Sequence, residues 1–425
     1  MTSNTRRIFT LTGVFLSLGM NAIPTGKIYG LSDLYRSTVD GAESVQTKIE
    51  ERVQVEETKT QSIGAFLPSI SGVGTYSKAG APSRIGAGFN GTTQKMARLT
   101  GKETLFTGGS EYAFMAQTNR LLEAKTAEVS DARLRYFVEL TTAYYETLLR
   151  QSLRSHAIRE LELYDNQIGE LRSRVKIGRT RASDLLSVQA ARAGSEARRM
   201  AAENAYLESK LALANLSRIP MDFELREETV TEAPLAPLET YLHDSIGRPS
   251  LVAARKQSEA SAKAIAVQRG MHFPTLDLTG NYYLLREGFP FDSNWDATLT
   301  LTVPIFSGGI TQSEVRQAAS TLRTNEVATV KLERATEIEI RTLHQTLLAS
   351  EAELKAFADA VQLATKSYEQ TQRDYKFGLV TNLDLLNSLQ TLTNAKRSYD
   401  QARYQHLLER ARLEASAGHL PLAGA

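Results

Sequence analysis

Two short stretches, LFTGGSEY at 105–112 and PIFSGGIT at 304–311, have nearly the same pattern: an aromatic residue, a hydroxyl residue and two glycines. Phe106 and Phe306 lie 200 positions apart. The same spacing relates several further segments: VKIG at 175–178 and YKFG at 375–378, then Asp184-Leu185-Leu186 and Asp384-Leu385-Leu386. Upstream, FLPSISGVGTY at 66–76 resembles HFPTLDLTGNYY at 272–283. The chain is therefore predicted to be internally duplicated.

Each copy contains a very long helical segment. No proline interrupts residues 109–174 or 309–374, and about 65 helical residues would extend roughly 100 Å. Helices of this length exceed the globular norm and favour coiled-coil packing. In the second copy, apolar residues recur at spacings of three and four over 385–402, which predicts one narrow apolar stripe.

The long helices are expected to reverse at glycines. Gly178 and Gly378 supply the positive φ that ends a helix. Ser183 or Thr381 is a candidate cap for the returning helix. Asp184 and Asp384 also suit a helix N-terminus, so capping is as good an explanation of both carboxylates as a functional role.

Four segments are predicted as strands. Residues 295–306, WDATLTLTVPIF, alternate strictly between apolar and hydroxyl or acidic side chains, with aromatic residues at both ends. This pattern over about ten residues is typical of a transmembrane barrel strand. The other predicted strands are 68–76, 95–106 and 274–284. Segment 95–106 is the poorest match, because Glu103 falls in phase with Leu99 and Leu105. Four strands cannot close a barrel, so a membrane-spanning sheet would require an oligomer.

The N-terminus has a different character. Arg6 and Arg7 precede an apolar run at 8–20, which predicts a secretory signal, with a buried N-terminal helix as the alternative. The expected organisation is residues 1–29 as the signal-peptide region, 30–217 as the first repeat, 218–242 as an inter-repeat segment and 243–425 as the second repeat.

The composition excludes several classes of function. The net charge is +2, with 50 basic and 48 acidic residues, so nothing indicates nucleic-acid binding. The chain has no Cys, and its six His residues show no metal-ligand spacing. The segment GAGFNG at 86–91 fits a dinucleotide motif but lacks the strand and helix around it. We therefore expect no enzyme activity, no cofactor and no metal.

The chain resembles the TolC family of outer-membrane efflux and secretion channel proteins. The resemblance rests on VPIFSGGITQSEVRQA at 303–318, YKFGLVTNLDLLNSLQTLTNAKRSYDQARY at 375–404 and LEASAGHL at 413–420. It implies a mainly α fold with a β-barrel portion: a duplicated protomer with coiled-coil-like helices and four transmembrane strands. It also implies a homotrimer, with a twelve-stranded β-barrel on an α-helical barrel whose middle is surrounded by 217–242.

The resemblance further implies a tunnel from the periplasm through the outer membrane, contacting outer-membrane lipid, a periplasmic adaptor protein and an inner-membrane transporter. It would export drugs or secreted proteins. The strand-to-helix turns would lie at Phe106, Gly108, Gly109, Phe306, Gly308 and Gly309. The periplasmic gate would involve Asp384, Tyr375, Ser183, Asp184, Asn387, Arg179 and Arg181. Adaptor docking would use Gly178, Arg179, Thr180, Gly378, Leu379 and Val380.

The chain departs from the family pattern at its gate. Asn387 stands where a second gate acid is expected, and Val380 stands where an arginine is often found. Because Arg179 and Arg181 lie in the first turn instead, we hypothesise that one of them pairs with Asp384 in the closed state. Two other classes remain open at this point: a periplasmic coiled-coil structural or adaptor protein, and an enzyme that uses the helices as a scaffold.

Overall fold

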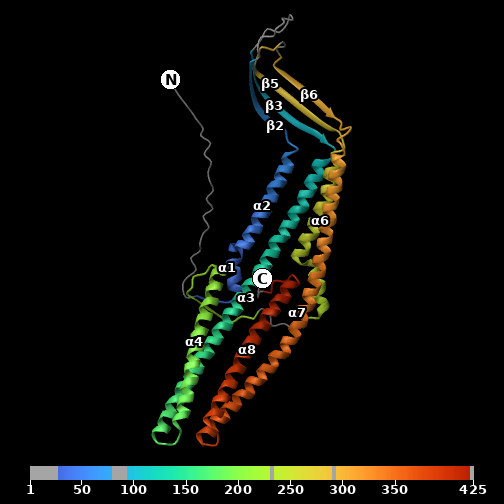
Figure 1. Ribbon diagram of the computed structural model, residues 1–425. Helices are drawn as coiled ribbons and strands as arrows, with labels where there is room; N and C mark the ends of the chain where they lie inside the picture. The colour runs from blue at the N-terminus through green and yellow to red at the C-terminus, as the bar shows by residue number, and fades with distance from the viewer. Residues whose placement is uncertain (1–26, 79–92, 230–233, 290–292, 422–425) are drawn as a thin grey trace, which may run out of the picture.

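The computed structural model describes residues 27–78, 93–229, 234–289 and 293–421. The apolar run at 8–20 and the GAGFNG segment at 86–91 lie outside these ranges. The protein is elongated, with a β-sheet at one end and the tips of two helical hairpins at the other (Figure 1). Its elements in chain order are β1 (Lys27–Tyr29), α1 (Leu31–Thr38), η1 (Val39–Gly41), α2 (Glu43–Gly64), β2 (Ser69–Lys78), β3 (Thr93–Thr107), α3 (Ser110–Lys176), α4 (Ala182–Ser217), β4 (Phe223–Leu225), α5 (Leu238–Asp244), η2 (Ser245–Gly247), α6 (Pro249–Gly270), β5 (Thr275–Glu287), β6 (Trp295–Thr302), α7 (Ile310–Lys376) and α8 (Asn382–Ser416).

The two long helices predicted from the absence of proline are present. α3 and α7 each contain 67 residues, and each is followed by a short turn and a second long helix. The prediction of a mainly α protein with four principal strands is therefore confirmed. Within the described ranges, no helix combines the length and the apolar character that crossing a bilayer requires.

The four principal strands form one antiparallel sheet in the order β2-β3-β5-β6. Cross-strand pairs show why the alternation matters. Leu278 faces Leu299 and Tyr282 faces Trp295, whereas Asn281 faces Asp296 between them. Because successive side chains point to opposite faces, one face of this sheet is apolar and the other polar. The sheet is open, with β2 and β6 at its edges.

One prediction about the strands needs correction, and another is confirmed. The strand predicted over 295–306 ends at Thr302, because Pro304 has no N–H to donate to a ladder. The segment judged the poorest, 95–106, lies within β3, which has 15 residues and pairs on both sides. Glu103 does lie opposite Leu278 in that ladder, so the anomaly in the alternation is real.

The main hydrophobic core surrounds the middle of α3. Phe137, Leu140 and Tyr144 are fully buried there, together with side chains from α1, α4, β4 and α8. The Tyr136 hydroxyl donates a hydrogen bond to Thr38 Oγ1 at 2.7 Å, so a buried polar group is satisfied. This core joins both hairpins at the middle of the molecule, and the hairpins extend from it to their tips.

Candidate gate at the helix tips

The two helix reversals have the same backbone structure. In the first, the Gly178 N–H donates to Val175 O at 3.0 Å and the Arg179 N–H to Arg174 O at 2.9 Å. The second repeats these bonds from Gly378 and Leu379. Gly178 and Gly378 have φ of 70° and 74°, as the sequence predicts. This bonding pattern satisfies carbonyls that a helix end leaves unpaired, and it needs a glycine in the left-handed region.

The second returning helix begins with a complete capping box. The Asp384 N–H donates to Thr381 Oγ1 at 3.3 Å, and the Thr381 N–H donates to Asp384 Oδ2 at 2.8 Å. These side-chain and backbone hydrogen bonds from Thr381 lower the pKa of Asp384 below its ordinary value. Thr381 is therefore the cap, and Asp384 has at least the structural role that its position allows.

The first returning helix has no such cap. Arg181 occupies the N-cap position of α4 and makes no side-chain cap hydrogen bond. Ser183 lies inside the first turn of the helix, so the suggestion that it caps α4 is wrong. Asp184 is also in that first turn. Among the described residues of this single chain, no ion pair joins Asp384 to Arg179 or Arg181.

Tyr375 lies between the hairpins rather than at the tip surface. It is buried in a cluster that contains residues of both hairpins, with partners that include Leu171 from α3 and Leu389 from α8. The Arg174 guanidinium lies over its ring at 5.0 Å from the centroid. Burial raises the pKa of Tyr375 above its ordinary value, which keeps the phenol neutral. Asn387 is exposed, one turn beyond Asp384.

A buried polar contact lies beside this cluster. The Gln167 carboxamide on α3 donates to Asn382 Oδ1 on α8 at 2.7 Å. Asn382 Nδ2 in turn donates to the Asp184 carbonyl at 3.4 Å. The side chains of Gln167 and Asn382 are both more than nine-tenths buried. One hairpin is thus joined to the other through amide groups that water reaches poorly.

Glu160 links the hairpins further from the tip. Its carboxylate is only 1% exposed, and each of its oxygens accepts a bond from a different arginine. Arg198 of α4 and Arg397 of α8 both approach to 2.6 Å. Each arginine therefore holds its own helix against α3, and Arg397 joins the second hairpin to the first.

A third link lies next along the helices. His156 Nε2 on α3 is 2.7 Å from Asp400 Oδ2 on α8, and Ser152 Oγ donates to the same oxygen. Burial alone would raise the pKa of Asp400, but the hydrogen bonds from His156 and Ser152 lower it below its ordinary value. The Asp400 carboxylate therefore stays ionised between the two hairpins.

The sequence did not single out these linking residues. Gln167 and Glu160 lie on α3 close in sequence to the buried residues Tyr164 and Ile168, so their polar character on a packed face was a usable signal. Their partners were not predictable, because Arg397 is 237 residues from Glu160. Asn382 could have been suspected only as a polar residue inside the capping turn.

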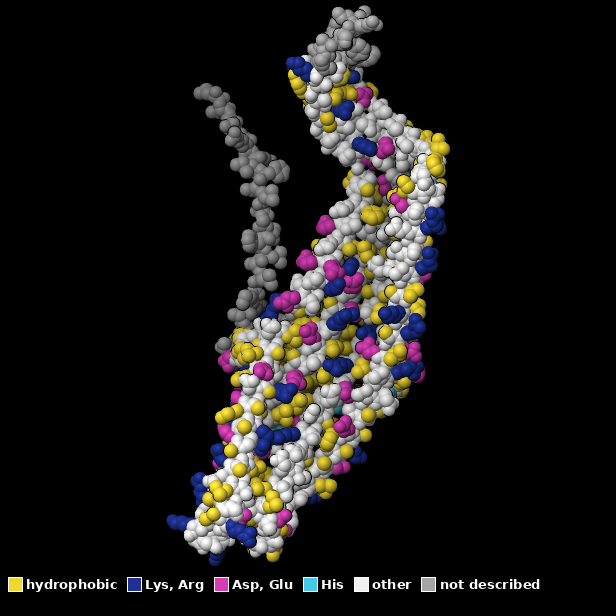
Figure 2. Space-filling view, viewed as in Figure 1, with side chains coloured by type: hydrophobic (Ala, Val, Ile, Leu, Met, Phe, Trp, Pro, Cys, Tyr) yellow, Lys and Arg dark blue, Asp and Glu magenta, His cyan; other side chains and the backbone are white. Residues whose placement is uncertain are grey.

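The predicted docking residues occupy the tip surface. Leu379 is 74% exposed, and its neighbours Ile177 and Phe377 are exposed as well. Gly178, Arg179 and Gly378 are exposed, whereas Thr180 and Val380 are half-buried. Dark blue Lys and Arg side chains also lie at the lower end of the α3–α4 hairpin in Figure 2.

The strand-to-helix turns lie at the opposite end of the helices. Gly108 and Gly308 have φ of 66° and 65°, and the glycine after each has a similar positive φ. A Cβ on Gly108 would lie 2.2 Å from the carbonyl oxygen of Gly270, whereas one on Gly308 would meet nothing within 4 Å. Phe106 and Phe306 are both exposed beside these turns.

Known proteins share this architecture. The family model described as outer membrane efflux protein matches residues 246–419. Outer membrane protein TolC of Vibrio cholerae is 22% identical over 416 residues, covering 92% of this chain and 91% of the relative. Alkaline protease secretion protein AprF of Pseudomonas aeruginosa is 24% identical over 419 residues, covering 92% and 85%. The crystal structure of outer membrane protein VceC from Vibrio cholerae matches with a TM-score of 0.77 at 19% identity, covering 92% of this chain and 96% of that one.

The fold and the matches define a class of outer-membrane transport proteins rather than enzymes. Within that class, the matches support the TolC family of outer-membrane efflux and secretion channel proteins. Its location is accordingly the outer membrane.

Proposed function

We propose that this chain forms the exit duct of a tripartite efflux pump or a type I secretion system. Three chains would join their sheets into one closed barrel in the outer membrane and their long helices into a tube across the periplasm. The observation that carries the proposal is the pairing of an open amphipathic sheet with two long helical hairpins in one chain. The sheet of one chain cannot span a membrane alone, since an open sheet edge is not tolerated in lipid.

Unpartnered surfaces support a trimer. β2 and β6 are the sheet edges, and each could pair with the opposite edge of a neighbouring chain. On β6, Leu299 and Leu301 are more than half exposed, which suits a face turned toward lipid. On α7, Val327, Ile338 and Leu363 are about two-thirds exposed, although soluble helices usually bury such residues. A neighbouring chain would cover them.

The tips would form the entrance gate. In this proposal the closed state is held by the three links between hairpins, and opening requires the α7–α8 hairpin to move away from α3. Asp384, Asp184 and Asn387 would then line the constriction in three symmetric copies. Arg179 or Arg181 would pair with Asp384 of a neighbouring helix in the closed state, because both arginines are exposed in the adjacent turn.

An adaptor protein would dock on the exposed tips. Ile177, Phe377 and Leu379 provide apolar anchors, and the arginines of the first turn provide charge around them. Aromatic and aliphatic residues of this kind dominate the energy of protein interfaces. The adaptor would connect the duct to an inner-membrane transporter, which would supply the energy and select drugs or proteins as cargo.

Single-channel recording in planar bilayers tests the duct and its gate together. Arg397→Gln removes the link from Glu160 to the second hairpin but keeps the bond to Arg198. A hydrogen bond to a charged group contributes about 1.5–3 kcal/mol, and Arg397 is partly exposed, so we expect the open probability to rise about tenfold. Asp384→Ala should also change the conductance and its pH dependence.

A matched control exists within the first hairpin. Asp165 and Arg192 form an ion pair at 2.5 Å that joins α3 to α4 and does not reach the second hairpin. Asp165→Asn should leave the open probability unchanged. The proposal would be wrong if folded, bilayer-inserted protein gave no current steps even after Arg397 and Asp384 were both altered.

A further inference from the structure

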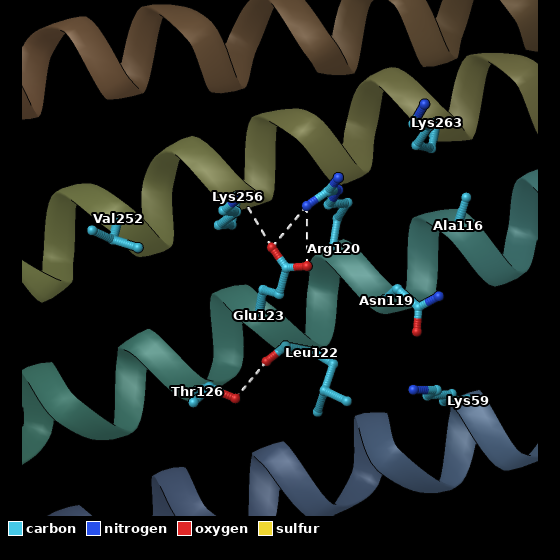
Figure 3. A pocket seen from close by; sticks show the side chains of 10 residues that line it. All are labelled: Lys59, Ala116, Asn119, Arg120, Leu122, Glu123, Thr126, Val252, Lys256 and Lys263. Atoms are coloured by element: carbon cyan, nitrogen blue, oxygen red, sulfur yellow. Dashed lines mark hydrogen bonds and ion pairs between the residues drawn. The ribbon is translucent and has the colours of Figure 1, made fainter.

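A hollow of about 810 Å³ lies between α2, α3 and α6, on the half of the molecule nearest the sheet. Figure 3 shows α3 between the other two helices, with labelled side chains from all three pointing toward the space. Its volume is in the range of sites that hold small organic molecules.

The ion pairs inside the hollow balance one another. Glu123 is 2.9 Å from Arg120 and 3.0 Å from Lys256. Glu259, on the adjoining turn of α6, is 3.3 Å from Arg120 and 3.2 Å from Lys256. Two cations and two carboxylates therefore form one neutral network that links α3 to α6.

Two further lysines lining the hollow have no carboxylate opposite them. Lys59 comes from α2 and Lys263 from α6, and no ion pair to either is found within the described residues. In Figure 3 the Asn119 carboxamide lies between them. Lys59 is half-buried, and Lys263 is exposed at the other side of the hollow. The hollow therefore carries two uncompensated positive charges with a neutral hydrogen-bonding group between them.

The rest of the lining is apolar. Ala116 and Leu122 of α3 and Val252 of α6 contribute to the wall. An inorganic anion would leave this wall solvated, whereas an anion with an apolar body would cover it. Two separated ammonium groups match two separated acid groups better than one.

We propose that this hollow is a binding site for an amphiphilic organic dianion, held by Lys59 and Lys263 through its acid groups and by the apolar wall through its body. Asn119 would donate a hydrogen bond to one acid group. The binding site rests on the geometry of the hollow. Its role as a station for exported cargo rests on the proposed duct.

Calorimetric titration of the full-length protein with naphthalene disulfonate, in an uncharged detergent at low salt, tests the site. The double variant Lys59→Gln/Lys263→Gln should bind about fivefold to thirtyfold more weakly, since partly exposed ion pairs contribute little each and two are lost. The matched control is Lys355→Gln/Lys366→Gln, which removes two exposed lysines of α7 and should bind as the unaltered protein does. To the unaltered protein, naphthalene monosulfonate should bind more weakly than the disulfonate. The Lys59/Lys263 variant should bind the two compounds about equally.

Three outcomes would overturn the proposal: no saturable binding of the disulfonate, equal binding by the Lys59/Lys263 variant, or equal weakening in the α7 control. The titration does not depend on a conducting pore, so its failure is distinct from failure of the duct. The cargo role has its own test, because disulfonate added to conducting channels should reduce their current, and less so in the Lys59/Lys263 variant. Tight binding with unaltered current would overturn the cargo role while leaving the duct intact.

Discussion

α3 and α7 are copies of one ancestral pattern, and they have become different helices. Both contain 67 residues, both follow two glycines with positive φ, and both end in the same bonded turn. Yet α3 packs against α2, α4, α6 and α8, whereas α7 packs mainly against α6 and α8. Leu148 of α3 is 5% exposed, and its repeat equivalent Leu348 is 45% exposed. Duplication has therefore preserved helix length and turn geometry, while burial depends on which neighbours each helix has.

The two hairpin tips differ in the same way. The turn of the second hairpin has a complete capping box, and the turn of the first has an arginine in the capping position. The returning helix of the second hairpin is thus better capped than that of the first, although the second hairpin is less buried. Local hydrogen bonds hold its tip, whereas tertiary packing holds the first hairpin.

The largest expected effect separates Leu148 from Leu348. Leu148→Ala removes buried methyl groups from the core around α3 and should lower the free energy of unfolding by about 2–5 kcal/mol. Leu348→Ala should lower it by less than about 1 kcal/mol in the dissociated chain. Urea titration followed by circular dichroism, in an uncharged detergent, measures both. Equal losses would mean that the two helices are equally buried in solution, contrary to the comparison.

A smaller effect separates the two caps. Thr381→Ala should cost about 1 kcal/mol of local stability, because the first turn of α8 loses its capping hydrogen bond. Hydrogen exchange of the amides at the start of α8 should then be several-fold faster. Arg181→Ala is the matched change in the first hairpin and should leave exchange at the start of α4 unaltered. Faster exchange at both tips would show that the effect is not specific to the capping hydrogen bond of Thr381.

The smallest effect is the pH dependence of the second cap. The pKa of Asp384 is lowered in the folded state, so its contribution is fully present above the ordinary value of 3.8 and is lost as pH falls through the lowered value. Protection of the α8 amides, corrected for intrinsic exchange, should therefore be constant above about pH 5 and decline below about pH 4. Thr381→Ala should flatten this dependence. A decline that persists in that variant would assign it to another carboxylate.

The sequence alone was sufficient for the long elements of the fold. Absence of proline over 109–174 predicted α3 almost to its ends, and Gly178 and Gly378 marked both reversals. The early end of β6 also follows from the sequence, because Pro304 has no N–H to continue the ladder. These features depend on residues close in sequence, where backbone chemistry decides the outcome.

The links between the hairpins could not be predicted from the sequence. Glu160 and Arg397, or Gln167 and Asn382, meet only after two helices more than 200 residues apart have packed together. Tyr375 was placed at the gate by resemblance, and the structure adds that its ring is buried between the hairpins. The gate assignments of Asp384, Asp184 and Asn387 remain predictions, since they concern neighbouring chains.

The two strand-to-helix turns, at Gly108 and Gly308, exclude ordinary residues for different reasons. At Gly108 the Cβ of an ordinary residue would collide with the carbonyl oxygen of Gly270, so both the lack of space and the sign of φ exclude it. At Gly308 there is open space, and only the sign of φ excludes ordinary residues. The second turn therefore selects for chirality rather than for size. A D-alanine introduced there by chemical ligation should suit the backbone, since the left-handed region is the natural conformation of a D residue.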